Sequence, residues 1–216
     1  MIHIEKTPYP AFVDFVERNK PQNWDALDAT VRTNTRKYIL VEEQGNQCAY
    51  TELPIEYEKN NSHIEHLKRK NVAFFPELTF EWTNLFVSCN ASDFGGKYKD
   101  ETYLKGKVKA DNALILNPAN ENPADFFELK SWGELIIKEN LNDNDRRKAE
   151  ITRDAFNLNH NSLIQRRTEM IQSVKDYKSG GLDDELIIDC LADSGFKSVI
   201  NFELETYRRT SPRSQA

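Results

Sequence analysis

The middle of the chain, from Cys48 to about Asp100, consists of short apolar runs separated by Gly, Pro and Asn. The two clearest runs are HIEHL at residues 63–67 and NLFVSC at residues 84–89. Neither run is long enough for a typical helix, and turn-forming residues interrupt the chain around them. This pattern predicts two short strands that are separated by a long loop.

Helical spacing is found on the N-terminal side of these strands. Apolar residues from Trp24 to about Glu43 recur at roughly helical intervals, and Pro21 stands just upstream as a start signal. On the other side, residues 126–129 and 134–137 flank Trp132-Gly133, which predicts a second and smaller hairpin.

Beyond Asp143 the pattern is helical again. One helix is expected to end at Gly180-Gly181, and its apolar face contains Leu163, Met170, Ile171, Val174 and Tyr177. A further helix should start after Asp183, because positions three and four apart share a face. The stripe of this helix that we expect to be buried contains Leu186, Ile187, Cys190 and Leu191.

Together these elements predict an α+β fold, with a small β core embedded in a mostly helical domain, an extra short hairpin and C-terminal helices. We expect an N-terminal helical segment at 1–45 and a β-containing core with the following hairpin at 46–140. A C-terminal helical region should follow at 141–209, and a disordered tail at 210–216.

The composition excludes several classes of protein. Aromatic residues form 11% of the chain, which is too many for wholesale disorder, and no stretch approaches the roughly 20 apolar residues of a membrane span. The start, MIHIEKTPYP, lacks the order of a signal peptide, so we expect a cytoplasmic protein with no membrane partner. Three cysteines are an odd and sparse set, which fits a reducing compartment.

The net charge argues against a protein that is held on nucleic acid by its overall field. Lys and Arg number 29 and Asp and Glu number 35, which gives −6. Any contact with nucleic acid must therefore be local or supplied by a partner.

The string His63-Ile64-Glu65-His66 holds half of the four histidines together with a carboxylate. On a strand, alternation places His63 and Glu65 on one side, and a strand that twists or ends can bring Glu65 and His66 to one opening. A carboxylate can hold a hard cation such as Mg²⁺, and a neutral imidazole can take a proton from water, so the pair suits a phosphodiesterase. The alternative is a pair of surface histidines near an acidic loop.

Downstream, WTNLFVSC at 82–89 is followed by the basic, glycine-rich turn GGKYKD at 95–100. A histidine at a strand end, a loop, Asn-Leu before a second strand, and then a cysteine and a lysine entering a helix together resemble the HNH nuclease motif. That motif is a ββα unit around one metal ion. The resemblance implies that His66 is the general base, that Glu65 is the metal-binding acid and that Asn84 braces the loop.

The order of further segments is similar to that of the retron-associated HNH family, which includes the Septu antiphage subunit PtuB. These segments are Glu42-Glu43-Gln44, Cys48-Ala49-Tyr50, HIEH, WTNLF, Ile115-Leu116-Asn117-Pro118, Leu158-Asn159, Leu163 and Arg166-Arg167. The resemblance implies a DNA-cleaving effector that works with an ABC-type, PtuA-like ATPase subunit. In some such systems a retron reverse transcriptase and its RNA–DNA product complete the assembly.

The chain departs from this family at its cysteines. Relatives often carry Cys-x-x-Cys where this chain has Cys48 and Thr51, and a second cysteine pair where it has Cys89 and then Gly95. A structural zinc site needs four thiolate or imidazole ligands, so structural zinc is not expected. Cys48 and Cys89 should instead pack as small side chains near each other.

The third metal ligand stays open at this stage. Gly95 and Gly96 have no side chain where the motif expects a His or Asn, which leaves Asp93 or Asp100 as substitutes. His63 is a further candidate, although a histidine on a strand face is more often a structural hydrogen-bonding group. Mg²⁺, or Mn²⁺ in its place, tolerates so sparse a set because Mg²⁺ keeps several waters and often takes one or two protein ligands.

Two basic clusters could contact the nucleic-acid backbone. Lys68-Arg69-Lys70 follows the proposed base directly, and a local cation cluster releases counterions whatever the net charge. Lys97 and Lys99 could bind flanking phosphates, or they could lie on a solvated helix turn.

Three functions compete: a metal-dependent HNH endonuclease with DNA as the favoured target, a catalytically silent HNH-like adaptor, and a small binding module. Retention of both Glu65 and His66 favours the nuclease. The helices after Gly181 hold more apolar residues than one stripe would use, which predicts a docking face for the ATPase, with an ordinary buried helix pair as the alternative. The apolar set is Leu186, Ile187, Ile188, Leu191, Phe196, Val199, Ile200, Phe202 and Leu204.

Overall fold

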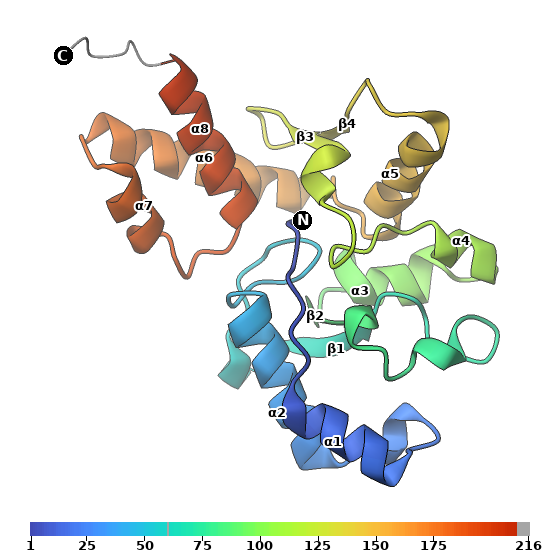
Figure 1. Ribbon diagram of the computed structural model, residues 1–216. Coiled ribbons are helices and arrows are strands. Elements are labelled where there is room, and N and C mark those ends of the chain that lie inside the picture. The colour runs from blue at the N-terminus through green and yellow to red at the C-terminus, as the bar shows by residue number, and fades with distance from the viewer. Residues whose placement is uncertain (60, 211–216) are drawn as a thin grey trace.

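The computed structural model describes residues 1–59 and 61–210. It combines helices with two small antiparallel sheets, which confirms the predicted α+β class (Figure 1). The predicted tail begins one residue too early, because Thr210 is the last residue of a helix. The rest of that tail, 211–216, lies outside the described residues.

The N-terminal segment is helical, but it is divided differently from the prediction. Helix α1 spans Pro10–Asn19, a 3-10 turn spans Trp24–Ala26, and α2 spans Ala29–Tyr38 and continues as a π-helical turn over Ile39–Glu43. The single helix expected from Trp24 is broken because two side chains cap separate starts. Asn23 accepts from the amides that open the 3-10 turn, and Asp28 accepts from the amides that open α2.

The two strands predicted in the middle of the chain are present. Strand β1 (Ser62–His66) pairs antiparallel with β2 (Leu85–Cys89), and Glu65 faces Phe86 across the pair. Every residue of β2 is buried. Short 3-10 turns at Tyr57–Lys59, Pro76–Leu78 and Trp82–Asn84 lie before and between the strands.

A helical segment follows β2 and packs against it. It consists of α3 (Gly95–Tyr98) and a π-helical turn (Lys99–Tyr103), and α4 (Lys109–Ala113) comes next. The chain order at the centre of the molecule is therefore strand, loop, strand, helix (Figure 1).

The second predicted hairpin is confirmed to within a residue at each strand. After a 3-10 turn at Pro123–Asp125, β3 (Phe127–Leu129) pairs with β4 (Leu135–Ile137). Gly133 in the connection has a positive φ of 84°, and a Cβ there would lie 2.3 Å from the Ile164 carbonyl oxygen. Only glycine allows this close approach of the hairpin to a later helix.

The C-terminal region contains α5 (Asp143–Ala155), α6 (Asn161–Ser179), α7 (Asp184–Cys190) and α8 (Lys197–Thr210). Helix α6 ends where Gly180-Gly181 predicts. Its predicted apolar face is buried except for Tyr177, which is partly exposed. In Figure 1, α6, α7 and α8 form a group at one end of the molecule, away from α1 and α2.

The predicted stripe of α7 is only half right. Ile187 and Leu191 are buried, whereas Leu186 is 49% exposed and Cys190 is exposed. Residues 186 and 190 precede the packed pair by one position, which turns them about 100° around the helix. The expectation that Cys190 belongs to the core is therefore wrong.

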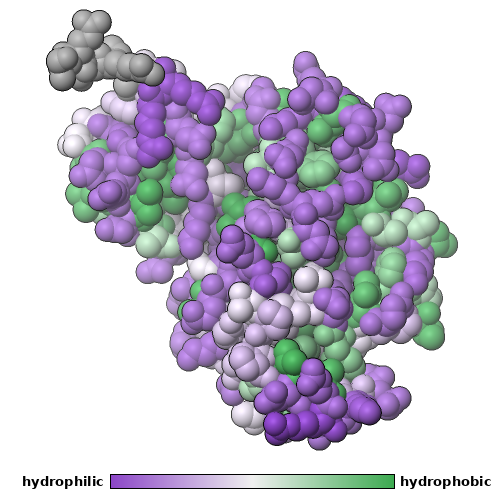
Figure 2. Space-filling view, viewed as in Figure 1, coloured by the Kyte–Doolittle hydropathy of each residue, from purple (hydrophilic) through white to green (hydrophobic). Residues whose placement is uncertain are grey.

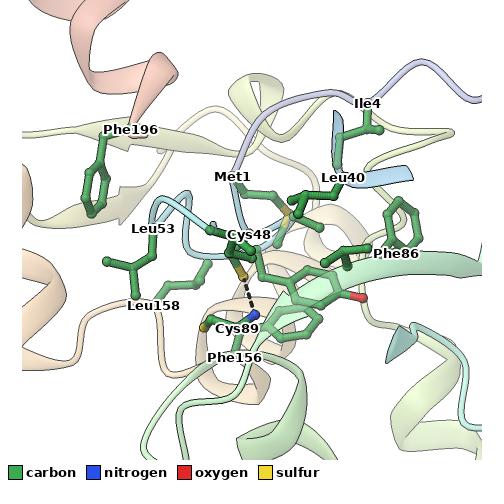
Figure 3. Packing of buried hydrophobic residues seen from close by; sticks show 14 of the residues in the cluster. Met1, Ile4, Leu40, Cys48, Leu53, Phe86, Cys89, Phe156, Leu158 and Phe196 are labelled. Carbon is green, nitrogen blue, oxygen red and sulfur yellow. Dashed lines mark hydrogen bonds between the residues drawn. The ribbon is translucent and has the colours of Figure 1, made fainter. Parts of the chain in front are cut away.

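Most of the core is one large cluster that joins the N-terminal segment, the strands and the C-terminal helices, and a smaller second cluster consists of Leu116, Phe126, Phe127 and Ala149. Figure 3 shows part of it, where Met1, Leu40, Phe86, Phe156 and Phe196 come from distant parts of the chain. Hydrophilic residues cover most of the face drawn in Figure 2, with apolar residues in smaller patches. Among the described residues, no helix has both the length and the apolar character needed to cross a membrane.

Candidate active site

A cleft of about 910 Å³ opens beside β1. Its walls come from the 3-10 turn at Trp24, from β1, from the loop that follows β1, and from the α3 segment. The structure brings the following candidates to this cleft: His63, Glu65, His66, Arg69, Lys70, Lys97 and Asp100. Residues that are far apart in the sequence therefore form one site.

The imidazole of His66 is almost fully buried, at 4% exposed, and is held in one orientation. Its Nε2 lies 3.0 Å from the backbone carbonyl oxygen of Thr79. Because a carbonyl can only accept, Nε2 carries the proton and Nδ1 carries the lone pair. Burial, followed by the charge of Lys70, lowers the pKa of His66 to about 4, so the ring is neutral near pH 7.

Glu65 and His63 lie on the same side of β1, as alternation predicts. His63 Nε2 lies 3.1 Å from Glu65 Oε2, and His63 Nδ1 lies 2.8 Å from Asn90 Oδ1. Both partners are oxygen atoms, so both bonds form only when the ring is doubly protonated. Burial lowers the pKa of His63, but the hydrogen bond and charge of Glu65 outweigh it and the net pKa is raised. In this geometry His63 is a partner of Glu65 and not a free metal ligand.

Lys99 does not face the cleft as a phosphate-binding residue, and this prediction is wrong. Its side chain is 0% exposed, and Nζ lies 2.5 Å from Glu65 Oε1 and 3.2 Å from Asp100 Oδ1. Nζ also donates to the carbonyl oxygens of His66 and Leu67, at 2.7 and 3.0 Å. Lys99 is the first residue of the π-helical turn, and its side chain is buried inside the fold.

The charges of Lys99 and its neighbours explain two further pKa shifts. Burial alone would raise the pKa of Glu65, but Lys99 and His63 outweigh it and lower it to about 2. Burial and the charge of Glu65 raise the pKa of Asp100 despite the nearby Lys99. Glu65 is therefore ionised near neutral pH, and Asp100 is the carboxyl group that gains a proton more readily.

Lys68 is also used inside the fold. Its Nζ donates to the carbonyl oxygens of Asn112, Ala113 and Ile115, at 2.9, 2.9 and 2.6 Å. Lysine near the C-terminal end of a helix satisfies carbonyls that have no partner within the helix, and here that helix is α4. The prediction that Lys68 contacts phosphate is therefore wrong. Arg69, Lys70 and Lys97 remain at the cleft.

Asn84 connects the two ends of the loop between the strands. Its Oδ1 accepts from the amide of Lys68 at 2.7 Å, and its Nδ2 donates to the carbonyl oxygens of Lys68 and Leu78, both at 3.0 Å. Asn84 is 2% exposed and does not line the large cleft. Asn84 is therefore a positioning residue. It fixes the conformation of the loop and does not itself reach the cleft.

Gly95 and Gly96 were interpreted above as absent ligands, and the structure gives them a packing role. A Cβ at Gly96 would lie 2.8 Å from the Cγ, Cδ and Oε2 atoms of Glu65. The amide of Gly96 donates to Ser88 Oγ at 3.0 Å. Glycine at this point lets α3 approach the Glu65 carboxylate closely.

The carboxylates at the cleft could hold a hard cation only weakly. Among the residues that the structure describes, no group of three or more His, Cys, Asp and Glu side chains is arranged to hold a metal. Asp93 is exposed and does not line the cleft, so its candidacy as a ligand is not supported. Glu65 and Asp100 remain, and two carboxylates with waters and a substrate phosphate can satisfy Mg²⁺.

Cys48 and Cys89 lie beside each other in the core (Figure 3). The amide of Cys89 donates to Cys48 Sγ at 3.5 Å, and Thr51 Oγ1 lies 3.9 Å from Cys89 Sγ. A Cβ at Gly95 would lie 3.4 Å from the same sulfur. The four positions that the family resemblance connects with zinc thus meet in space, and two of them carry no thiolate or imidazole.

Sequence reasoning missed Trp24 as part of the site. Its ring lies edge-on to His66 and lines the cleft. Helical spacing was the only signal at this position, and it gave no indication of contact with His66, 42 positions later.

Two curated proteins share sequence with this chain. The chain resembles the Septu protein PtuB. It is 27% identical to PtuB of Bacillus thuringiensis over 96 residues, which are 44% of this chain and 33% of that protein. It is 23% identical to PtuB of Bacillus mycoides (strain KBAB4) over 166 residues, which are 68% of this chain and 54% of that protein. The chain therefore spans about a third to a half of the length of these relatives. No protein-family model matches it.

Proposed function

We propose that this chain is an HNH-type endonuclease and the effector subunit of a Septu-like antiphage defence complex. The observation that carries the proposal is the pairing in one cleft of a neutral, oriented imidazole, His66, with an ionised carboxylate, Glu65. The order of β1, β2 and α3 agrees with a ββα unit, and the distant similarity to PtuB agrees with a defence component.

In the proposed reaction, water attacks the phosphorus of a phosphodiester and His66 accepts the proton of that water at Nδ1. The bond from phosphorus to the 3′-oxygen breaks, and the leaving 3′-oxygen takes a proton from solvent. The Thr79 carbonyl keeps Nε2 protonated, so Nδ1 stays available as a base. Asn84 hydrogen-bonds to the backbone beside Thr79 and to the backbone just after His66, and so fixes these two segments relative to each other. Arg69, Lys70 and Lys97 at the cleft would bind flanking phosphates.

Glu65 and Asp100 are the residues that would hold Mg²⁺ or Mn²⁺, which when bound would neutralise the charge that develops on the phosphate. Glu65 would offer Oε2, the oxygen on the His63 side, because Lys99 takes Oε1. Structural zinc is not part of this proposal, since the zinc-type positions hold two sulfurs only.

The complete complex would include an ABC-type, PtuA-like ATPase, a nucleic-acid substrate that we expect to be DNA, and in retron-type systems a reverse transcriptase with its RNA–DNA product. A charge of −6 gives the free chain no long-range attraction for DNA, so a partner would supply part of the affinity. We therefore expect weak cleavage by the chain alone.

A catalytically silent adaptor is the second candidate. It is favoured by one observation, the ion pair between Lys99 and Glu65, which occupies one of the two carboxylate oxygens and already balances the charge that would attract a metal. In this function His66 and Glu65 would be packing residues, and only assembly with the ATPase would matter.

The test is cleavage of plasmid DNA by the complex co-purified with its neighbours, in Mg²⁺ or Mn²⁺. His66→Ala should reduce the rate by about 10²- to 10⁴-fold, because it removes the general base. His3→Ala is the matched control, since it removes an exposed imidazole outside the cleft. Equal cleavage by folded His66→Ala and His3→Ala complexes would exclude the assignment, and no cleavage by the wild-type complex would favour the adaptor.

A further inference from the structure

The ammonium group of Lys99 lies among four oxygen atoms behind the wall of the cleft. Two belong to the carboxylates of Glu65 and Asp100, and two are the backbone carbonyls of His66 and Leu67. All four distances fall between 2.5 and 3.2 Å. The side chain is 0% exposed, so water does not compensate for any of these contacts.

A group of carboxylate and carbonyl oxygens is the environment that hard cations select in proteins. Here a covalently attached cation fills it. Burying an ammonium is costly unless it is paired and hydrogen-bonded, and Lys99 meets both conditions. The position therefore behaves as a cation site whose occupant is part of the chain.

This arrangement divides the two oxygens of Glu65. Oε1 faces Lys99, and Oε2 faces Nε2 of His63. Gly96 closes the remaining side, where even a methyl group would clash with the carboxylate. A divalent ion that enters the cleft meets a carboxylate whose charge is already balanced on both sides.

We propose that Lys99 is the resident counter-ion of Glu65 and competes with a divalent metal for that carboxylate. This inference rests on the proposed function only in taking the cleft as the metal site. Lys99 thereby keeps the affinity of the free chain for metal low, and it acts as a positioning residue because it touches Glu65 and not the substrate.

A purely structural role for Lys99 makes a different prediction. If the ammonium only anchors the end of β1 through the carbonyls of His66 and Leu67, its removal changes stability and leaves metal affinity unchanged. Lys6 offers a matched control, because it is a buried lysine that pairs with Glu43 and donates to the Leu85 carbonyl at 2.8 Å, outside the cleft.

The experiment measures binding of Mn²⁺ alone to the full chain, by the electron paramagnetic resonance signal of free Mn²⁺, without substrate. Lys99→Met should bind Mn²⁺ more tightly than the wild type, on the order of tenfold or more, because a like charge near the ion is removed. Lys6→Met should bind as the wild type does. Adding Glu65→Gln to Lys99→Met should abolish the gain, which assigns the gain to this carboxylate.

Lys99→Met removes one of the two cationic partners of Glu65 and the ammonium group beside Asp100, and it could fail to fold. The charge-balanced variant Lys99→Met with Asp100→Asn avoids this difficulty, and it should bind Mn²⁺ more tightly than Asp100→Asn alone. Unchanged or weaker binding in whichever of these variants folds would overturn the inference, even if the complex cuts DNA. Tighter binding without any cleavage by the wild-type complex would support the inference and count against the proposed nuclease.

Discussion

The indole ring of Trp24 lies edge-on to the imidazole of His66, with ring centroids 4.6 Å apart and planes at 88°. Trp24 also stacks on Phe80, at 6.1 Å and 26°. The N-terminal segment therefore supplies the side chain that covers the candidate base. Since burial is the largest cause of the lowered pKa of His66, Trp24 helps to keep that ring neutral.

Trp24→Ala should raise the pKa of His66 towards 6.5 and lower the free energy of unfolding by about 3 kcal/mol, as expected when a buried indole is removed. Trp24→Phe should keep most of both properties. The pKa is measured from the proton chemical shifts of the His66 ring across a pH titration. A pKa of His66 that stays near 4 in a folded Trp24→Ala protein would show that Trp24 does not control it.

Stability should fall as the pH drops from 6.5 to about 4. In this window the unfolded chain binds a proton at His66 that the folded chain does not, so the free energy of unfolding decreases by up to roughly 3 kcal/mol. Glu65 acts in the next window, because its stabilising charge is complete above 4.5 and is lost as the pH falls towards 2. His63 has a raised pKa, so its contribution to stability is complete below pH 6.5 and is lost as the pH rises above 6.5.

Urea unfolding at several values between pH 6.5 and pH 5 measures this dependence. His66→Gln should reduce the slope of stability against pH in that interval. Equal slopes in His66→Gln and the wild type would mean that His66 is not neutral in the fold.

The strands, the second hairpin and the end of α6 could be predicted because each depends on local patterns. Short apolar runs between turn residues predicted β1 and β2, and Gly180-Gly181 predicted the end of α6. Strand alternation is also a local property, and it correctly predicted that His63 and Glu65 lie on the same side of β1.

The features that were missed depend on long-range contacts. The sequence alone does not distinguish Lys99 from a surface lysine. In the structure Lys99 is buried at the start of the π-helical turn and pairs with Glu65, 34 residues earlier. From the sequence, Gly96 is a position where a metal ligand is missing. In the structure, the Glu65 carboxylate occupies the space that a side chain at Gly96 would need. No periodicity in the sequence encodes these approaches, because packing across the cleft decides them.

Gly96→Ala should destabilise the protein by about 1 to 3 kcal/mol, because the added methyl group overlaps the Glu65 side chain. Gly180→Ala is the matched control, since its Cβ would meet neighbours at 3.4 Å or more, which is ordinary contact. Thermal unfolding of both variants provides the comparison. Equal stability of the two would mean that Glu65 does not lie against α3 in solution.

Purified protein should contain well under one zinc per chain, and a chelator should leave it folded. Thr51 and Gly95 stand where two further ligands would be needed beside Cys48 and Cys89. Elemental analysis, with circular dichroism before and after chelation, measures both properties. Stoichiometric zinc together with unfolding on chelation would contradict this account of the two cysteines.

The predicted docking face is smaller than the sequence suggests. Most of the apolar set after Gly181 lies in the core of the chain itself, and Glu52 accepts from the amide and hydroxyl of Ser198 at the start of α8. Deleting this region would therefore unfold the protein and not test docking. Leu186 and Ile188 on α7 remain, at 49% and 44% exposed.

Changing both Leu186 and Ile188 to Asp should remove the ATPase from a pull-down while the protein stays folded, because neither side chain belongs to the buried core. Leu186 and Ile188 lie about 200° apart around α7, so the double variant places a charge on each exposed side of the helix. A charge on the side that docks would lose its water, and that cost weakens the complex. Val108→Asp is the control, since Val108 is an apolar side chain that is 64% exposed at the start of α4. Retention of the ATPase by the double variant, measured at equal protein concentration, would place the docking surface elsewhere on the chain.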